Sequence, residues 1–291
     1  MLLWLKILWA ALTPVLSTVV LSALLVHAPV QALGAEPQRD YLVFGFLPIL
    51  SSEKLVRRFS PLVEYLSAEL DVDIRMETAP DFAEFVRRTR DEKRYDILFT
   101  APHLYYLANR VSHYRALVRV DKPGMKAVIV APLSGGVGSV EDLRGRRLAT
   151  TGPLALSTLL VKNLLLSSGV DPDRDLTLVA TPSHNANLLS SYQGATDASA
   201  LMLPVYRRMR PDIIDTMKII AETPSVPHIP IAVAPWVDVP TASRLRATLL
   251  GMADTERGRA LLQQLDWPGF ATTQDSEYDA LQWITDQLVV D

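Results

Sequence analysis

Two predicted helix starts in the segment 150–200 carry small polar side chains. Ser157 and Thr158 begin the first helix, and Ser183, His184 and Asn185 begin the second. The first N–H groups of a helix lack partners within the helix, and the helix dipole adds partial positive charge there. Two such starts that face one cleft predict a binding site for a small anion.

The rest of the sequence has no pattern typical of catalysis. The five histidines have no zinc-site spacing, no G-x-S-x-G motif occurs, and the chain has no cysteine. We therefore predict a protein that is not an enzyme, with no cofactor and no metal. An enzyme on a two-lobe α/β fold is an alternative that turnover assays would decide.

Strand and helix patterns alternate along the chain and would position these residues. Strands are expected at 41–47, 74–78 and 96–100, and helices at 52–70, from 82 and from 102. Such alternation is typical of a parallel sheet with helices on its two faces, which binds ligands at the carboxyl ends of its strands. The extended pairs 116–120 with 126–131, and 217–222 with 229–234, predict two crossings between two lobes.

The N-terminal segment indicates export. Lys6 precedes a run without charge from Ile7 to Ala35, which is typical of a signal peptide; its apolar part is also long enough for an uncleaved membrane anchor. We therefore expect a periplasmic protein, with inner-membrane anchoring as the alternative. The net charge of −3 gives no support for nucleic-acid binding. The expected divisions are 1–35 for the leader, 36–124 for lobe 1, 125–228 for lobe 2, and 229–291 for the return to lobe 1 and the C-terminal helices.

Five stretches in a fixed order carry a family resemblance. They are Gly45–Pro48, Asp96–Pro102, Ser139–Arg147, Ser183–His184 and Gly194–Ala198. Together they resemble the phosphonate/phosphite-binding (PhnD-like) family of periplasmic substrate-binding proteins. The resemblance implies an α/β, type II periplasmic-binding fold: two lobes, each a mostly parallel sheet flanked by helices, joined by two hinge crossovers. It also implies a monomer that captures a small anionic ligand between its lobes and delivers it to an inner-membrane ABC permease.

The sequence departs from the family at the first helix start. Family members that hold phosphonates typically carry Ser-Thr-Ser-Gly after a proline, whereas Pro153 here is followed by Leu154-Ala155-Leu156-Ser157-Thr158. Two hydroxyl donors are replaced by Ala155 and Leu156, and each charge-assisted bond contributes about 1.5–3 kcal/mol. A carboxylate or a larger, partly apolar ligand therefore fits this cleft as well as a phosphonate-like or phosphite-like oxyanion.

The expected ligand contacts come from both lobes, and several have a structural alternative. Tyr105 either lines the cleft or covers the core, Asp197 pairs with a ligand amine or with an arginine of its lobe, and Ser157 and Asn185 can simply cap helices. A membrane-anchored ligand sensor for a signalling partner is the alternative to import. The predicted site residues are Pro48, Ser51, Thr100, Tyr105, Ser157, Thr158, His184, Asn185 and Asp197.

Overall fold

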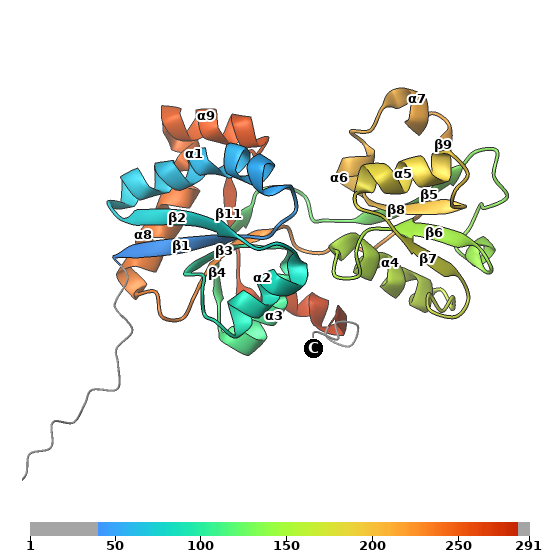
Figure 1. The fold of residues 1–291 in the computed structure, drawn as a ribbon. Helices are drawn as coiled ribbons and strands as arrows, with labels where there is room; N and C mark the ends of the chain where they lie inside the picture. The colour runs from blue at the N-terminus through green and yellow to red at the C-terminus, as the bar shows by residue number, and fades with distance from the viewer. Residues whose placement is uncertain (1–39, 285–291) are drawn as a thin grey trace, which may run out of the picture. The chain divides into compact units, whose positions relative to one another are not determined.

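The computed structural model describes residues 40–284, and it forms two β-sheets flanked by helices (Figure 1). The predicted two-lobe α/β architecture is confirmed at this level. The expected leader at 1–35 lies outside the described residues. Within the described residues, no helix has the length and apolar character needed to cross a membrane.

The first sheet has six strands in the order β11-β4-β10-β3-β1-β2. Helices α1, α8 and α9 pack together on it, and α2, α3 and the 3-10 helix η3 form a second group (Figure 1). We call this sheet with its helices the first lobe. Its elements are β1 (Tyr41–Phe46), α1 (Ser52–Leu70), β2 (Asp73–Thr78), α2 (Phe82–Arg90), β3 (Ile97–Phe99), α3 (Pro102–Ser112), β4 (Arg115–Val120), β10 (Pro230–Val233), α8 (Val239–Leu250), η2 (Met252–Asp254), α9 (Glu256–Leu265), β11 (Phe270–Thr272) and η3 (Asp275–Ile284).

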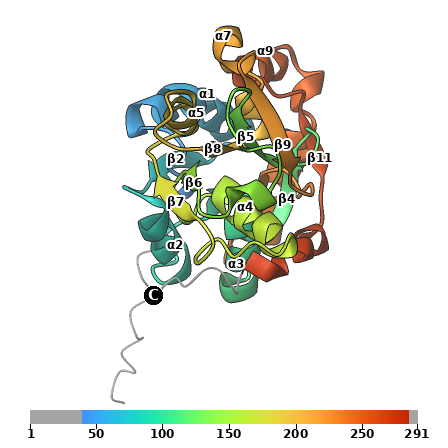
Figure 2. The ribbon, with the colours of Figure 1, turned by 90° about the vertical axis from the view of Figure 1, so that its right-hand side faces the viewer.

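The second sheet has five strands in the order β7-β6-β8-β5-β9. Helices α4 and α5 lie on either side of β6 and β8 (Figures 1 and 2). We call this sheet with its helices the second lobe. Its elements are β5 (Ala127–Pro132), η1 (Glu141–Leu143), β6 (Arg147–Thr150), α4 (Leu156–Ser167), β7 (Thr177–Ala180), α5 (His184–Tyr192), β8 (Ala198–Met202), α6 (Leu203–Tyr206), α7 (Pro211–Ile214) and β9 (Met217–Glu222).

Both sheets are mixed, whereas mostly parallel sheets were expected. Strands β2, β1 and β3 pair in parallel, as do β7, β6 and β8. Returning strand β10 instead pairs antiparallel with β3 and β4, and β5 pairs antiparallel with β8 and β9. The parallel part of each sheet is the part built from strand–helix–strand units, which require a crossover.

Helix α1 shows how the sequence pattern builds the first lobe. Leu55, Phe59, Leu62 and Leu66 recur at helical spacing and are all buried against the sheet. Pro61 lies inside the helix without breaking it, and α1 runs from Ser52 to Leu70. Ring contacts between Phe59 and the strand phenylalanines, with centroids 4.9 Å from Phe46 and 5.1 Å from Phe99, fix the helix on the core.

Two connections join the lobes. The chain leaves the first sheet after β4 and enters β5, and it returns from β9 to β10. Met125 and Val226 pair across these two connections in an isolated antiparallel bridge. The two crossings therefore lie side by side.

Candidate functional site

A cleft of about 530 Å³ is lined by residues of both lobes. The first lobe contributes the loop after β1 and the start of α2, and the second lobe contributes the loops before α4 and α5. These loops follow β1, β6 and β7 at their carboxyl ends, where ligands bind in α/β sheets. The lining residues are Pro48, Ile49, Asp81, Phe82, Ala83, Thr151, Gly152, Pro153, Leu154, Ala155, Pro182, Ser183 and His184.

Helix α4 begins without a side-chain cap. Its N-cap is Ala155, whose side chain has no oxygen to accept a hydrogen bond from the first turn. Thr151 Oγ1 lies 3.1 Å from Ser157 Oγ and 3.3 Å from Thr158 Oγ1, and Thr158 Oγ1 also lies 3.2 Å from the carbonyl oxygen of Thr151, to which it donates. The hydroxyls of Ser157 and Thr158 are buried and are engaged with the loop. Since Ala155 cannot cap the helix either, no side chain accepts from the first N–H groups of α4.

Helix α5 begins with a capped turn. Ser183 Oγ accepts a hydrogen bond from Ala186 N at 3.2 Å. His184 follows as the first helical residue, and its Nδ1 is buried without a hydrogen-bond partner. Burial lowers the pKa of His184 below the ordinary 6.5, so the ring is neutral at pH 7. A neutral imidazole can still donate one hydrogen bond to a ligand.

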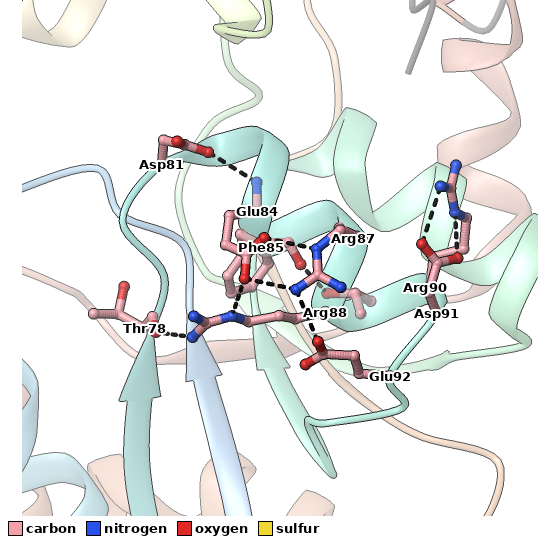
Figure 3. A network of polar contacts seen from close by, with 10 residues as sticks. Thr78, Asp81, Glu84, Phe85, Arg87, Arg88, Arg90, Asp91 and Glu92 are labelled. Carbon is pink, nitrogen blue, oxygen red and sulfur yellow. Dashed lines mark hydrogen bonds and ion pairs between the residues drawn. The ribbon is translucent and has the colours of Figure 1, made fainter. Parts of the chain in front are cut away.

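The start of α2 brings a carboxylate to the cleft. Asp81 caps this helix by accepting from Glu84 N at 2.8 Å (Figure 3). Hydrogen bonds from Arg87 and then Arg88 hold the pKa of Glu84 at about 2. The arginines of α2 are paired with acids in or directly after their own helix, and no lysine or arginine is among the described residues that line the cleft.

His103 connects the α4 loop to the first lobe. It lies in the first turn of α3, fully buried, and its Nε2 is 2.9 Å from the carbonyl oxygen of Leu154. Burial lowers the pKa of His103 to about 4, so it is neutral and donates from Nε2. Its role is to position the loop.

Only two of the predicted ligand residues, Pro48 and His184, line the cleft. Tyr105 is buried in the first lobe: its hydroxyl donates to Asp275 Oδ1 at 2.5 Å and accepts from Ala116 N at 2.7 Å. Asp197 accepts from Arg147 N at 2.9 Å, and its carboxylate lies 3.6 Å from Arg146 Nη1. Tyr105 therefore covers the core, and Asp197 pairs with arginines of its own lobe.

The other predicted residues lie beside the cleft or away from it. Thr100 is buried at the end of β3 and borders a separate cavity of about 160 Å³ between α2 and α3. Ser51 is the exposed N-cap of α1, without a side-chain cap bond. Asn185 is exposed in the first turn of α5, and neither Ser51 nor Asn185 is among the lining residues. Leu156, expected at the rim, is buried in the core, so Ala155 alone faces the cleft.

Sequence reasoning missed several lining residues. Thr151 directly follows β6 and bonds both hydroxyls that were expected to meet the ligand. Asp81 lines the cleft and was not among the predicted ligand residues. Ile49 and Phe82 give the cleft an apolar wall from the first lobe. Thr151 could have been predicted because it directly follows a strand, where ligands bind in α/β sheets. No local sequence pattern indicated that Ile49 and Phe82 would line the cleft.

Two residues of the motifs, Gly45 and Asp96, have structural roles. A Cβ on Gly45 would lie 2.5 Å from the Tyr95 ring, so the strand packs there only with glycine. Asp96 accepts from Val43 N and from Trp236 Nε1, each at 2.7 Å. These residues hold the first sheet together. Within the described residues, no group of three or more His, Cys, Asp or Glu side chains is arranged to hold a metal ion.

Comparison with known proteins gives a consistent family. Residues 44–278 match the family model described as "ABC transporter, phosphonate, periplasmic substrate-binding protein". The chain is 22% identical over 259 residues to the phosphonates-binding periplasmic protein of Escherichia coli K12, covering 83% of this chain and 75% of that protein.

Solved structures support the fold. The methylphosphonate complex of PhnD1 from Prochlorococcus marinus has a TM-score of 0.74 at 17% identity, covering 86% of this chain and 99% of the other. A binding-protein component of an ABC phosphonate transporter from Pseudomonas aeruginosa has a TM-score of 0.72 at 18% identity, with coverages of 85% and 87%. The sulfonate-binding protein SsuA of Escherichia coli has a TM-score of 0.56 at 15% identity, with coverages of 85% and 91%.

Proposed function

Since the chain belongs to the family of periplasmic substrate-binding proteins of phosphonate ABC transporters, we propose that its cleft captures a small anion and presents it to an inner-membrane permease. The observation that carries the proposal is the uncapped start of α4 beside the start of α5 in one cleft. Free N–H groups and the positive ends of two helix dipoles favour an anion there.

The mechanism follows from where the donors lie. The N–H groups of Leu156, Ser157 and Thr158 belong to the first turn of α4, and His184 supplies a further donor from α5. Pro48, Ile49 and Phe82 approach from the first lobe. A ligand held by the second lobe would meet these residues, so it favours arrangements in which the lobes enclose it. The permease would then recognise the enclosed form.

The remaining parts of the proposal concern the whole chain. We propose that the protein acts as a periplasmic monomer and that the segment 1–35 is a leader, removed on export or kept as an anchor. We also retain the divisions 36–124, 125–228 and 229–291 as the working limits of the lobes. The protein needs no catalytic group for this role.

Calorimetry with phosphite, methylphosphonate, methanesulfonate and succinate tests the proposal. At least one anion should bind and should raise the melting temperature, and the rise should increase with the logarithm of its affinity. If no anion of the panel binds, and none stabilises the protein, the proposed function is wrong.

Two variants of sequence-predicted residues locate the site. His184→Gln should lower the affinity for the anion roughly threefold to tenfold, because it changes a hydrogen-bond donor in the cleft. Asp197→Asn is the matched control in the same lobe, and it should leave the affinity unchanged because Asp197 pairs with Arg147 and Arg146 outside the cleft. If only Asp197→Asn lost affinity for the anion, the binding site would lie outside the cleft.

A further inference from the structure

The charges that line the cleft are unusual for a site that must hold a dianion. Only two of the lining residues have titratable side chains, Asp81 and His184. Asp81 is an acid, and the partly buried His184 ring is neutral at pH 7 because burial lowers its pKa. The donors that remain are neutral N–H and O–H groups.

The nearest arginine-rich segment does not change this balance. Arg87 and Arg88 of α2 are bonded to Glu84, and Arg87 also pairs with Glu92 (Figure 3). Arg90 of the same helix pairs with Asp91. These guanidinium groups are engaged along the helix, and none of them borders the cleft.

The lining is also largely apolar. Ile49 and Phe82 come from the first lobe, and Pro153, Leu154 and Pro182 come from the second. Ile49 is 45% exposed, a large fraction for an isoleucine. Each methylene group that a ligand buries against such side chains adds affinity. The cleft therefore offers apolar contact next to a few neutral donors.

From these observations we infer that the cleft selects a singly charged anion with an apolar substituent, such as an alkylsulfonate or a medium-length alkylcarboxylate, over a doubly charged phosphonate. The inference rests on the proposed function, because it specifies the ligand of the same cleft. Removing a second charge from water costs several kcal/mol unless a cation pairs with it, and helix N–H groups carry only partial charge. The Asp81 carboxylate adds repulsion that grows with ligand charge.

The loss of family hydroxyls agrees with this choice. Ala155 stands in the cleft where a hydroxyl is typical, and Ser157 and Thr158 are turned toward Thr151. A sulfonate or carboxylate spreads one charge over its oxygens and needs fewer donors than a dianion. The apolar substituent would lie against Ile49, Phe82 and Leu154.

Matched six-carbon ligands test the inference by calorimetry: hexanesulfonate, hexanoate, hexylphosphonate and hexanol. At about pH 9 the phosphonate is a dianion, and at about pH 5.5 it is largely a monoanion, since its second proton dissociates between these values. Hexanesulfonate stays singly charged throughout and so reports any effect of pH on the protein itself. Methanesulfonate tests the contribution of the apolar substituent.

We expect hexanesulfonate and hexanoate to bind about tenfold or more tightly than hexylphosphonate at about pH 9, with the gap to hexanesulfonate closing to about threefold at about pH 5.5. Hexanol should bind at least about tenfold more weakly than hexanesulfonate, and so should methanesulfonate. Tighter binding of the phosphonate dianion would overturn the inference while the proposed function stands. Equal binding of hexanol would also overturn it, and failure of every anion would instead refute the proposed function.

Asp81→Asn supplies the second test. Asparagine still caps α2 at this position, so the fold is kept while the charge is removed. The variant should gain about threefold to tenfold in affinity for hexylphosphonate at about pH 9 and clearly less for hexanesulfonate. Asp238→Asn, the same change at the cap of α8 outside the cleft, is the control and should change neither. An equal gain for both ligands in Asp81→Asn would contradict the charge-selection argument.

Discussion

The starts of α4 and α5 follow adjacent strands and face the same cleft, yet they use their first N–H groups differently. At α5 the Ser183 side chain accepts from Ala186 N, so one donor is already satisfied. At α4 the N-cap is Ala155, and no side chain accepts from the first turn. The difference indicates that α4 leaves more of its first N–H groups available to a ligand, whereas α5 satisfies one of them with its own cap.

The loops before the two helices use the same device. Thr151 follows β6 and lies within hydrogen-bond distance of Ser157 and Thr158. Thr181 follows β7 and donates to the Asn187 side chain at 2.5 Å and to the Ser183 carbonyl at 3.0 Å. Each threonine thus ties a strand end to the helix that follows. The α4 loop is held from the other lobe as well, because His103 Nε2 lies 2.9 Å from the carbonyl oxygen of Leu154.

The largest expected effect concerns that extra contact and its pH dependence. His103 has its pKa lowered from 6.5 to about 4 in the folded protein, so between these values the unfolded chain binds more protons than the folded one. The His103 contribution is complete above about pH 6.5, and it is lost as the pH falls toward about 4. This loss should reach about 3 kcal/mol of unfolding free energy.

Urea unfolding at a series of pH values measures this effect. His103→Gln keeps a donor for the Leu154 carbonyl but does not titrate, so its stability should fall less steeply between about pH 6.5 and 4. The carboxylates contribute equally to both proteins, so their contribution cancels in the difference between the two unfolding free energies at each pH. If the unfolding free energies of the two proteins fell in parallel with pH, protonation of the buried His103 would not be the cause of the loss.

The second prediction removes the difference between the two helix starts by giving α4 a side-chain cap. Ala155→Asp gives α4 a side-chain cap and places a carboxylate where the ligand is expected. Unfolding free energy should rise by about 1 kcal/mol, while anion affinity should fall about a hundredfold. Calorimetry and urea unfolding on one preparation measure both. Unchanged affinity would mean that α4 does not hold the ligand.

The third effect compares the loop threonines. Thr151→Val leaves the buried hydroxyls of Ser157 and Thr158 without that partner and should cost about 2 kcal/mol of unfolding free energy. Thr181→Val is the matched change in the α5 loop and should cost about as much. Only Thr151→Val should also weaken anion binding, since Thr151 lines the cleft and Thr181 does not. Equal losses of affinity would remove the distinction between the loops.

The smallest effect tests the cap of α5. Ser183→Ala removes the bond to Ala186 N and should cost about 1 kcal/mol of unfolding free energy. Thr255→Ala removes the comparable cap of α9, which accepts from Gly258 N at 3.0 Å. The two variants should lose similar unfolding free energy. The rise in melting temperature on adding the anion should differ from that of the wild type only for Ser183→Ala.

The fold was largely predictable because its signals are local. Periodic apolar residues define α1, and the capping pattern of Asp81 and Glu84 defines the start of α2. The antiparallel pairing of β5, where the chain enters the second lobe, and of β10, where it returns to the first, was not predicted, because strand direction within a sheet depends on how the chain crosses between lobes.

The site was predictable as a region but not residue by residue. Tyr105 bonds Asp275, which is 170 residues away in the sequence, and no local pattern reveals that partner. Ser157 and Thr158 have the residue types of a ligand contact, but Thr151 occupies their hydroxyls. Helix starts could be located from sequence, whereas the direction of each hydroxyl depends on packing.

Amide chemical shifts on titration of the ¹⁵N-labelled protein test the central claim most directly, with hexanesulfonate and methylphosphonate as probes. The account predicts that at least one probe shifts the amide signals of Leu156, Ser157 and Thr158 most, followed by His184 and its neighbours. The account would be contradicted if neither probe moved these signals, or if the largest shifts lay outside the residues around the cleft.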